Sequence, residues 1–370
     1  MRIPLSKPDI TSREIKAVIK VLQTPLLSIG PQLLKFEELF AGYIGRRYAV
    51  GVNSGTSALH LLIKYLGIKE GDEVITTPFS FISSANCIMF ERGTPVFVDI
   101  DPETLNIKED AIEDKITNRT KAMLIVDVFG HPVDWDKISR ISKKYDIPVI
   151  EDSCESLGSE YKGKKTGRFG VGSVFAFYPN KQITTGEGGM IVTDRKDLYD
   201  FTRSLRNQGR SETDDWLEHT RLGYNYRLDE LSAVLGLIQL QRIESILRKR
   251  TAAALKYNRL IQEIDGVSHL QVKKYVSRMS WFVYIVILEK GINRELVLKK
   301  LKETGIQAKP YFPPIHLQPF YVEQFGYKKG DYPITESIST RSIALPFFNN
   351  ISDKEIRYVC KKLEIIIGSI

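Results

Sequence analysis

Residues 51–62 read GVNSGTSALHLL and pass from an apolar strand into an amphipathic helix. The strand ends at a polar turn, after which Leu59 and Leu62 fall on one face of a helical period. Free backbone N–H groups at a helix start, beside the hydroxyls of Thr56 and Ser57, suit a bound phosphate. Helix capping by Thr56 is the alternative interpretation and is compatible with phosphate. The stretch matches neither the P-loop nor the GxGxxG fingerprint.

Outward from this stretch, short β-branched runs alternate with segments of helical period up to about residue 194. The runs are 48–52, 73–77, 96–99, 122–128, 148–151, 173–177 and 190–193. Alternation of strands and helices predicts an α/β fold, with a mainly parallel central sheet sandwiched by helices.

The pattern changes after Asn225. Residues 229–257 have the period of one long helix, and a strand at 281–288, helices at 293–304 and 352–366 and a proline-rich loop at 310–319 follow. We therefore expect a large domain over residues 1–245 and a smaller C-terminal α+β domain over residues 246–370.

Composition narrows the classes of protein. The 370 residues carry a net charge of +8, but Lys and Arg are spread along the chain among acids, which disfavours a nucleic-acid partner. Three cysteines are too few for a disulfide framework and their spacing matches no metal site. The N-terminus lacks the apolar core of a signal peptide, and the longest apolar run, 281–288, is far shorter than the roughly 20 residues that span a bilayer. We expect a cytoplasmic protein without metal or membrane partner.

Residues 175–193, FAFYPNKQITTGEGGMIVT, contain one lysine, Lys181, between two strands and before three glycines. A loop lysine is usually solvated. Here the glycines allow close backbone approach, and the strands would form a rigid seat. A lysine desolvated in such a seat has a lowered pKa and can react as the neutral amine that Schiff-base chemistry requires.

Residues 149–155, VIEDSCE, place Glu151 and Asp152 at the end of an apolar strand. Ligand-facing groups lie at that end of the strands in parallel α/β sheets. A carboxylate there is either a helix N-cap or the partner that keeps a pyridinium nitrogen protonated.

Together these segments make the chain resemble the DegT/DnrJ/EryC1/StrS family of pyridoxal-phosphate sugar aminotransferases, within fold type I, the aspartate aminotransferase superfamily. The resemblance covers essentially the whole chain. Further matching segments are IPLSKPDIT, LLSIGPQLLKFEELFAGYIG, GDEVITTPFSFISSANCI, VDVFGHPVDWD, GYNYRLDELSAVLGLIQL and GIQAKPYFPPIHLQPFY.

The resemblance implies roles for individual residues. Lys181 matches the Schiff-base lysine and Asp152 the pyridinium partner, while Thr56 and Ser57 match the phosphate-binding pair. Phe81 matches an aromatic ring stacked on the cofactor, with core packing as the alternative. Asn225 matches an asparagine that reaches the phosphate in the neighbouring subunit, which implies a homodimer with shared sites.

Two departures from the family pattern concern the cofactor. Glu155 stands where many members have glutamine, and a carboxylate near the cofactor's phenolic oxygen must be protonated or held by a cation. Ala176 replaces a phosphate-binding serine, for which Tyr178 or Asn180 could substitute. In the proline-rich loop, Tyr311 and His316 are candidate substrate contacts, although a lone loop histidine is more often structural.

The resemblance implies an aminotransferase that uses pyridoxal 5′-phosphate and L-glutamate to convert a nucleotide-linked keto sugar, a 4-keto-6-deoxyhexose, into an amino sugar for polysaccharide or glycan synthesis. A pyridoxal-phosphate-dependent sugar dehydratase is one alternative, but members of that branch replace the lysine with histidine. A non-catalytic pyridoxal-phosphate-binding regulatory protein is the other. A nicotinamide oxidoreductase is disfavoured because the GxGxxG fingerprint is absent.

Overall fold

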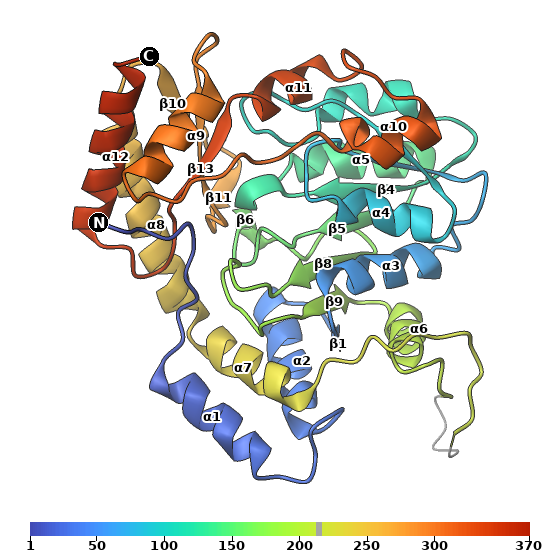
Figure 1. The fold of residues 1–370 in the computed structure, drawn as a ribbon. Coiled ribbons are helices and arrows are strands. Elements are labelled where there is room, and N and C mark those ends of the chain that lie inside the picture. Colours follow the sequence, from blue (N-terminus) through green and yellow to red (C-terminus); the bar gives the residue numbers. More distant parts are fainter. Residues whose placement is uncertain (212–216) are drawn as a thin grey trace.

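A computed structural model describes residues 1–211 and 217–370. Its centre is a seven-stranded sheet in the order β1-β9-β8-β5-β4-β2-β3 (Figure 1). The strands are β1 Tyr48–Val52, β2 Glu73–Thr76, β3 Thr94–Phe97, β4 Thr120–Val126, β5 Val149–Asp152, β8 Gly172–Ala176 and β9 Gly189–Thr193. Only β9 runs antiparallel to its neighbours among these strands. The expected α/β class and mainly parallel sheet are confirmed, and each of the seven β-branched runs overlaps one of its strands.

Helices cover both faces of this sheet because its strands are apolar on both sides. On one face, Val50 and Val174 share a core with Leu59 and Leu62 of α3. On the other, Met190 packs with α2 and α7, and further along that face α5 covers β4 and β5. The helices that pack around the central sheet are α2 Pro31–Ile44, α3 Gly55–Tyr65, α4 Ser83–Phe90, α5 Trp135–Tyr145, α6 Lys196–Arg206 and α7 Glu230–Gln241.

The C-terminal part forms a smaller antiparallel sheet, in the order β10-β12-β13. Its strands are β10 Val267–His269, β12 Tyr284–Leu288 and β13 Ser342–Leu345, and its helices are α8 Ile243–Ile261, α9 Arg294–Glu303 and α12 Asp353–Ile367. A third sheet joins β6 Glu160–Tyr161, β7 Lys164–Lys165 and β11 Val276–Arg278. The division between residues 245 and 246, which falls just inside α8, stays a prediction.

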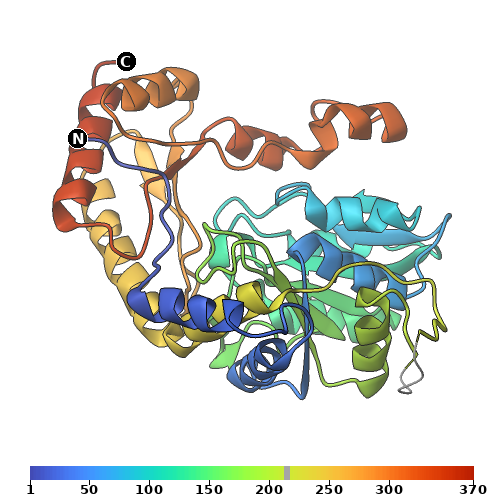
Figure 2. The same cartoon turned by 60° about the horizontal axis from the view of Figure 1, so that its bottom comes forward.

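Two further segments, one N-terminal and one C-terminal, pack against the helices of the large domain. Helix α1, Ser12–Leu22, lies along α7, while α10 Pro319–Phe325 and α11 Pro333–Ser339 extend from the small domain over the edge that carries α4 (Figure 2). The Ile315 amide donates to the Pro78 carbonyl at 2.9 Å, and the Thr335 amide donates to Asp99 at 2.9 Å. The proline-rich loop is thereby held beside the large domain.

Two expected elements differ in their bounds. The expected long helix at 229–257 is two helices, because the chain turns at Arg242, whose guanidinium bonds to Asp9 and Glu14 near α1. The expected strand at 281–288 begins at Tyr284. The guanidinium of buried Arg250 donates hydrogen bonds to the carbonyl oxygens of Trp281 and Phe282, at 2.8 and 2.7 Å. Those carbonyls are therefore not used for pairing in the sheet.

Candidate active site

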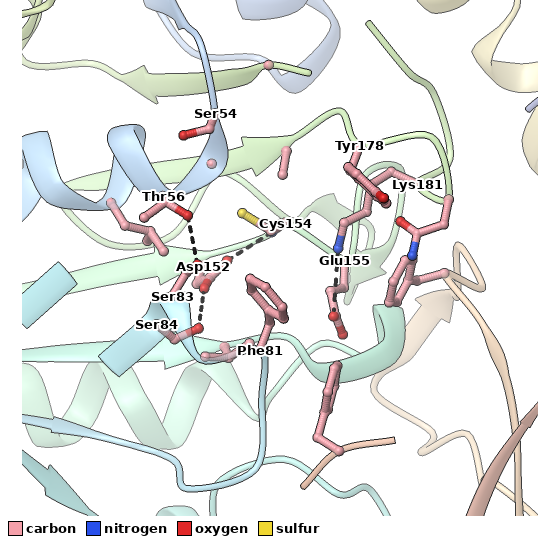
Figure 3. A pocket seen from close by; sticks show the side chains of 18 of the residues that line it. Ser54, Thr56, Phe81, Ser83, Ser84, Asp152, Cys154, Glu155, Tyr178 and Lys181 are labelled. Atoms are coloured by element: carbon pink, nitrogen blue, oxygen red, sulfur yellow. Dashed lines mark hydrogen bonds and ion pairs between the residues drawn. The ribbon is translucent and has the colours of Figure 1, made fainter. Parts of the chain in front are cut away.

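A cavity of about 510 Å³ lies at the carboxyl ends of the central strands, where α/β sheets place their ligands (Figure 3). It is lined by residues from the start of α3, the segment around α4, the ends of β4, β5 and β8, the loop between β8 and β9, and the small domain. The lining residues are Ser54, Gly55, Thr56, Leu59, Phe81, Ser83, Ser84, Val126, Asp152, Cys154, Glu155, Ala176, Tyr178, Asn180, Lys181, Glu187, Gly188, Phe282, Tyr311 and Phe312.

Lys181 enters the cavity from the loop between β8 and β9. Its backbone amide donates to the Tyr178 carbonyl at 2.9 Å, which closes a tight turn. Its side chain is 12% exposed, and Nζ lies 3.9 Å from the centroid of the Phe282 ring and 3.7 Å from Glu155 Oε1. Figure 3 shows the lysine pointing toward Glu155. Lys181 is thus a largely desolvated amine between an aromatic face and a carboxyl group.

Gly189 explains why this loop sits close to α3. A Cβ atom on Gly189 would lie 2.5 Å from the carbonyl oxygen of Ser54 and 2.8 Å from the amide nitrogen of Gly55. Any side chain at this position would therefore push β9 away from the helix start. The glycine-rich sequence sets the approach of the lysine loop to α3.

Asp152 ends β5 and is buried. Its Oδ2 accepts a hydrogen bond from Ser84 Oγ at 2.8 Å, and its Oδ1 accepts one from the Cys154 amide at 3.1 Å. Each oxygen keeps further acceptor capacity, because an ionised carboxylate has about four lone-pair sites. The two bonds fix the carboxylate in orientation while it lines the cavity, so it can accept a proton-bearing ring nitrogen.

The start of α3 forms another part of the cavity wall. Ser54 caps the helix by accepting the Ser57 amide at 3.1 Å, and Thr56 Oγ1 lies 2.7 Å from Ser83 Oγ. Gly55 lets the helix start sit against β8, because a Cβ atom there would lie 2.8 Å from Ala176 Cβ. The first amides of a helix have no intrahelical acceptor, so those of Gly55 and Thr56 suit an anion.

Glu155 lies on the lysine's side of the cavity and is buried. Its Oε2 accepts a hydrogen bond from the Phe129 amide at 2.8 Å. Burial raises the pKa of Glu155, while the positive charge of Lys181 and the Phe129 amide act in the opposite direction. Of the two conditions that the sequence argument set for a carboxylate at this position, protonation or a nearby cation, the structure places the cation Lys181 beside it.

Two aromatic candidates also face the cavity. Phe81 is 60% exposed, so core packing does not account for it. Tyr311 lines the cavity from the proline-rich loop, and burial together with Glu155 raises the pKa of its phenol. Nearby, Asn180 Oδ1 is buried without a hydrogen-bond partner among the described residues, which leaves an acceptor at the cavity wall.

Three candidates lie outside the cavity lining. The Ser57 hydroxyl is turned to Ser54 Oγ, at 2.9 Å. Asn225 is exposed on the loop before α7, where its carbonyl accepts a bond from Asn53. His316 is fully buried, and its Nε2 lies 3.1 Å from Glu336 Oε1, an arrangement that holds α11 against the loop.

Sequence reasoning did not single out several residues that complete the cavity. These are Ser54, Ser83, Ser84, Cys154, Phe282 and Phe312. Ser83 and Ser84 follow the FSF segment after one intervening residue, and Cys154 lies two residues after Asp152, so their neighbours carried a signal. Phe282 carried none, because it reads as part of an apolar strand.

The residues present fit pyridoxal phosphate. A desolvated amine, a fixed buried carboxylate and a helix start with free amides line one cavity, and these are the groups that the cofactor's aldehyde, ring nitrogen and phosphate require. Among residues 1–211 and 217–370, no group of three or more His, Cys, Asp or Glu could hold a metal ion. No helix in those two ranges is long and apolar enough to cross a membrane.

The family model of the DegT/DnrJ/EryC1/StrS aminotransferase family matches residues 8–364. The chain is 38% identical to GDP-perosamine synthase of Escherichia coli O157:H7, over 98% of this chain and 97% of the relative. It is 34% identical to UDP-4-amino-4-deoxy-L-arabinose–oxoglutarate aminotransferase of Shewanella sediminis, over 99% and 98%. The solved structure of Helicobacter pylori PseC, an aminotransferase of pseudoaminic acid biosynthesis, superposes with a TM-score of 0.96, 31% identity and complete coverage of both chains.

These likenesses confirm the expected fold type I architecture, the expected cofactor and the expected enzyme class, a pyridoxal-phosphate-dependent sugar aminotransferase. The family match spans nearly the whole chain, including all three sheets and every residue that lines the cavity. The chain belongs to the DegT/DnrJ/EryC1/StrS aminotransferase family.

Proposed function

We propose that the enzyme transfers the amino group of L-glutamate to the keto carbon of a nucleotide-linked 4-keto-6-deoxyhexose during glycan synthesis. The names of its relatives support this choice. One is named for a GDP-linked amino sugar. Another is named for a UDP-linked 4-amino sugar and for oxoglutarate, the keto acid that glutamate becomes when it gives up its amine.

The observation that carries the proposal is that Lys181, Asp152 and the start of α3 line the same cavity. Pyridoxal phosphate, when bound, supplies an electron sink through its protonated ring nitrogen. The fixed carboxylate of Asp152 holds the proton at that nitrogen. The amides of Gly55 and Thr56 bind the phosphate, assisted by the Thr56 hydroxyl.

Lys181 Nζ carries the proton transfers in this proposal. Its loop is fixed by the Tyr178 turn and by Gly189, so the amine is held at the cavity with little freedom. A positioned base contributes roughly 10²–10⁴-fold to a rate. Phe81 covers the cofactor ring, and Tyr311 contacts the sugar from the proline-rich loop.

We further propose a homodimer in which Asn225 reaches the cofactor phosphate of the partner subunit. Asn225 is exposed and lies outside its own cavity lining, as a residue that serves another subunit would. Large apolar side chains are exposed on α1, on the segment that follows it and in the first turn of α2: Ile15, Ile19, Leu22, Leu26, Leu27, Ile29 and Leu34. An apolar surface of this kind is typical of a subunit interface.

The expected cytoplasmic location has support from the cysteines. Cys87, Cys154 and Cys360 are free thiols. Free thiols persist in compartments that glutathione and thioredoxin keep reduced. We therefore propose the cytoplasm as the place of the reaction.

The test is an assay of the purified protein with pyridoxal phosphate, ¹⁵N-labelled glutamate and a panel of GDP- and UDP-linked 4-keto-6-deoxy sugars. Mass spectrometry should find the label on the sugar and oxoglutarate in equal amount. Loss of a sugar hydroxyl without label would favour the dehydratase alternative. Cofactor binding without turnover of any panel member would favour the regulatory alternative.

A further inference from the structure

Glu155 is held so that only one of its oxygens can exchange a proton with the lysine. Oε2 accepts the Phe129 amide at 2.8 Å, which keeps that oxygen an acceptor. Oε1 lies 3.7 Å from Lys181 Nζ, a separation that a small side-chain rotation closes to a hydrogen bond. The side chain of Gln182, the residue after the lysine, donates to the Glu155 carbonyl at 2.6 Å. These bonds hold the Glu155 carboxyl and the Lys181 amine in fixed positions relative to each other.

The charges around this carboxyl favour an ionised Glu155 only beside a cation. Lys181 is the cation that faces it. The other titratable groups near it are Asp152 on β5, Cys154 after β5 and Tyr311 from the small domain. Asp152 opposes a second negative charge, and the thiol and phenol supply no positive one. If Nζ becomes neutral, a buried carboxylate at this position loses its compensation.

A base must be neutral to accept a proton, so the proton on Lys181 needs a destination inside the cavity. In a low-dielectric site, moving it from amine to carboxylate discharges both groups, which removes two buried charges. A glutamine in place of Glu155 could accept a hydrogen bond but could not take the proton. A carboxylate at position 155 can therefore accept the lysine proton, which an amide cannot.

We propose that Glu155 and Lys181 form a proton-sharing pair, in which Glu155 Oε1 takes the proton that Lys181 Nζ loses before it acts as a base. The N–H bond at Nζ breaks with its electron pair left on nitrogen, an O–H bond forms at Oε1, and nothing is oxidised or reduced. The reverse transfer restores the ammonium group. This inference rests on the proposed aminotransferase mechanism, in which Lys181 moves protons.

Infrared spectra of the cofactor-free protein test the pair directly. The carbonyl stretch of protonated Glu155 is obtained as the difference between Lys181→Met and the double variant Lys181→Met with Glu155→Gln. Buried Asp127, whose pKa burial and Glu151 raise, is common to both proteins and cancels. We expect a protonated-carboxyl band near neutral pH once the lysine is replaced, and a carboxylate band when wild type and Glu155→Gln are compared. An ionised Glu155 in the Lys181→Met variant overturns the proposal.

The kinetic test uses the glutamate half-reaction of the loaded enzyme, which needs no sugar. Glu155→Gln should lower its rate roughly 100-fold with little change in glutamate KM, as expected for loss of a proton acceptor. The rate of this variant should then rise with pH, because solvent must remove the lysine proton. Glu155→Asp should recover part of the rate. A Glu155→Gln variant with the wild-type rate and pH profile overturns the transfer, even if the infrared bands are as expected.

Failure of the pair and failure of the proposed substrate are distinguishable. If no keto sugar of the panel is aminated while the infrared bands and the half-reaction behave as expected, the substrate proposal is wrong and the pair stands. Thermal unfolding of each variant serves as the control for folding. Glu155→Gln is nearly isosteric, so a melting temperature close to that of the wild type is expected.

Discussion

Lys181 and Lys164 show how differently two lysines of one chain are placed. Lys164 is exposed on β7, whereas Lys181 is 12% exposed and lies against the Phe282 ring. Only the neutral amine forms an imine with an aldehyde, and of these two lysines only Lys181 lines the cavity whose residues fit that aldehyde. Reactivity toward the cofactor should therefore be confined to Lys181.

Borohydride reduction followed by peptide mapping checks this expectation. The reduced cofactor adduct should be found on Lys181, and Lys181→Ala should lose at least roughly 10³-fold in turnover, since its seat offers no second amine. Lys164→Ala is the matched control and should keep wild-type turnover. An adduct on Lys162, Lys164 or Lys165 would overturn the assignment.

Asp152→Asn separates the hydrogen bond of Asp152 from its charge. An amide still fits between Ser84 and the Cys154 amide, but it cannot hold a ring nitrogen protonated. We expect kcat to fall more than cofactor affinity, by roughly 10²-fold or more. An unchanged kcat, measured at saturating cofactor, would contradict the role of the carboxylate as the partner of the ring nitrogen.

At the scale of elements, a half-buried polar cluster ties the loop that carries Asn225 to α3. His60 on α3 lies 2.9 Å from Glu91 Oε1 through Nε2 and 3.1 Å from the Tyr226 hydroxyl through Nδ1. Lys64 Nζ donates to the other Glu91 oxygen at 2.7 Å. A carboxylate only accepts hydrogen bonds, so Nε2 of His60 is the donor to it. The cluster fixes the loop relative to the helix whose start lines the active site.

The pKa of Glu91 gives this cluster a pH signature. Burial raises that pKa, but the bonds from Lys64 and His60 outweigh it and hold the pKa below its ordinary value of 4.5. A carboxyl with a lowered pKa in the folded state stabilises fully above its ordinary value and loses that contribution as pH falls through the folded value.

Glu91→Gln should therefore destabilise the protein by about 2 kcal/mol near neutral pH. The difference from the wild type should shrink below pH 4.5. Urea unfolding across this range is the measurement. Glu70→Gln removes a partner in an exposed ion pair with Arg92 and is the control, expected to cost under about 1 kcal/mol. A pH-independent difference for Glu91→Gln would show that packing, not charge, sets its contribution.

At the scale of the whole molecule, shared sites predict complementation between subunits that carry different lesions, when cofactor is limiting. Mixing Asn225→Ala with Lys181→Ala subunits gives heterodimers in which one site combines both lesions and the other has neither. Activity in the mixture should rise well above the sum of the separate variants. Loss of the Asn225 bond to a charged phosphate should alone weaken cofactor retention by roughly 1.5–3 kcal/mol.

The mixing experiment needs proof that heterodimers form, which native mass spectrometry supplies. If they form and activity stays at the level of the separate variants, Asn225 acts within its own subunit or not at all. A monomeric protein by the same measurement would contradict the homodimer proposal itself.

The sequence by itself determined the sheet and the chemistry of its loops. Strands such as MLIVDVF are apolar on both faces, and that pattern is local, so all seven strands of the central sheet could be predicted. The glycines after Lys181 and the hydroxyls at the start of α3 also carry local signals. The identity of the cofactor then followed from a resemblance, because several weak motifs occur in one order.

Tertiary structure decided what depends on partners distant in the chain. Arg250, on α8, donates hydrogen bonds to the carbonyls of Trp281 and Phe282, which the sequence assigns to a strand. Phe282 therefore stays outside the strand, and its ring lies against Lys181. His316 reads as a loop histidine but is buried against Glu336. Glu155 reads as an unexplained carboxylate until Lys181, 26 positions later, is found beside it. Apolar period and turn chemistry act over neighbouring residues, whereas these charges and carbonyls find their partners only when the chain has folded.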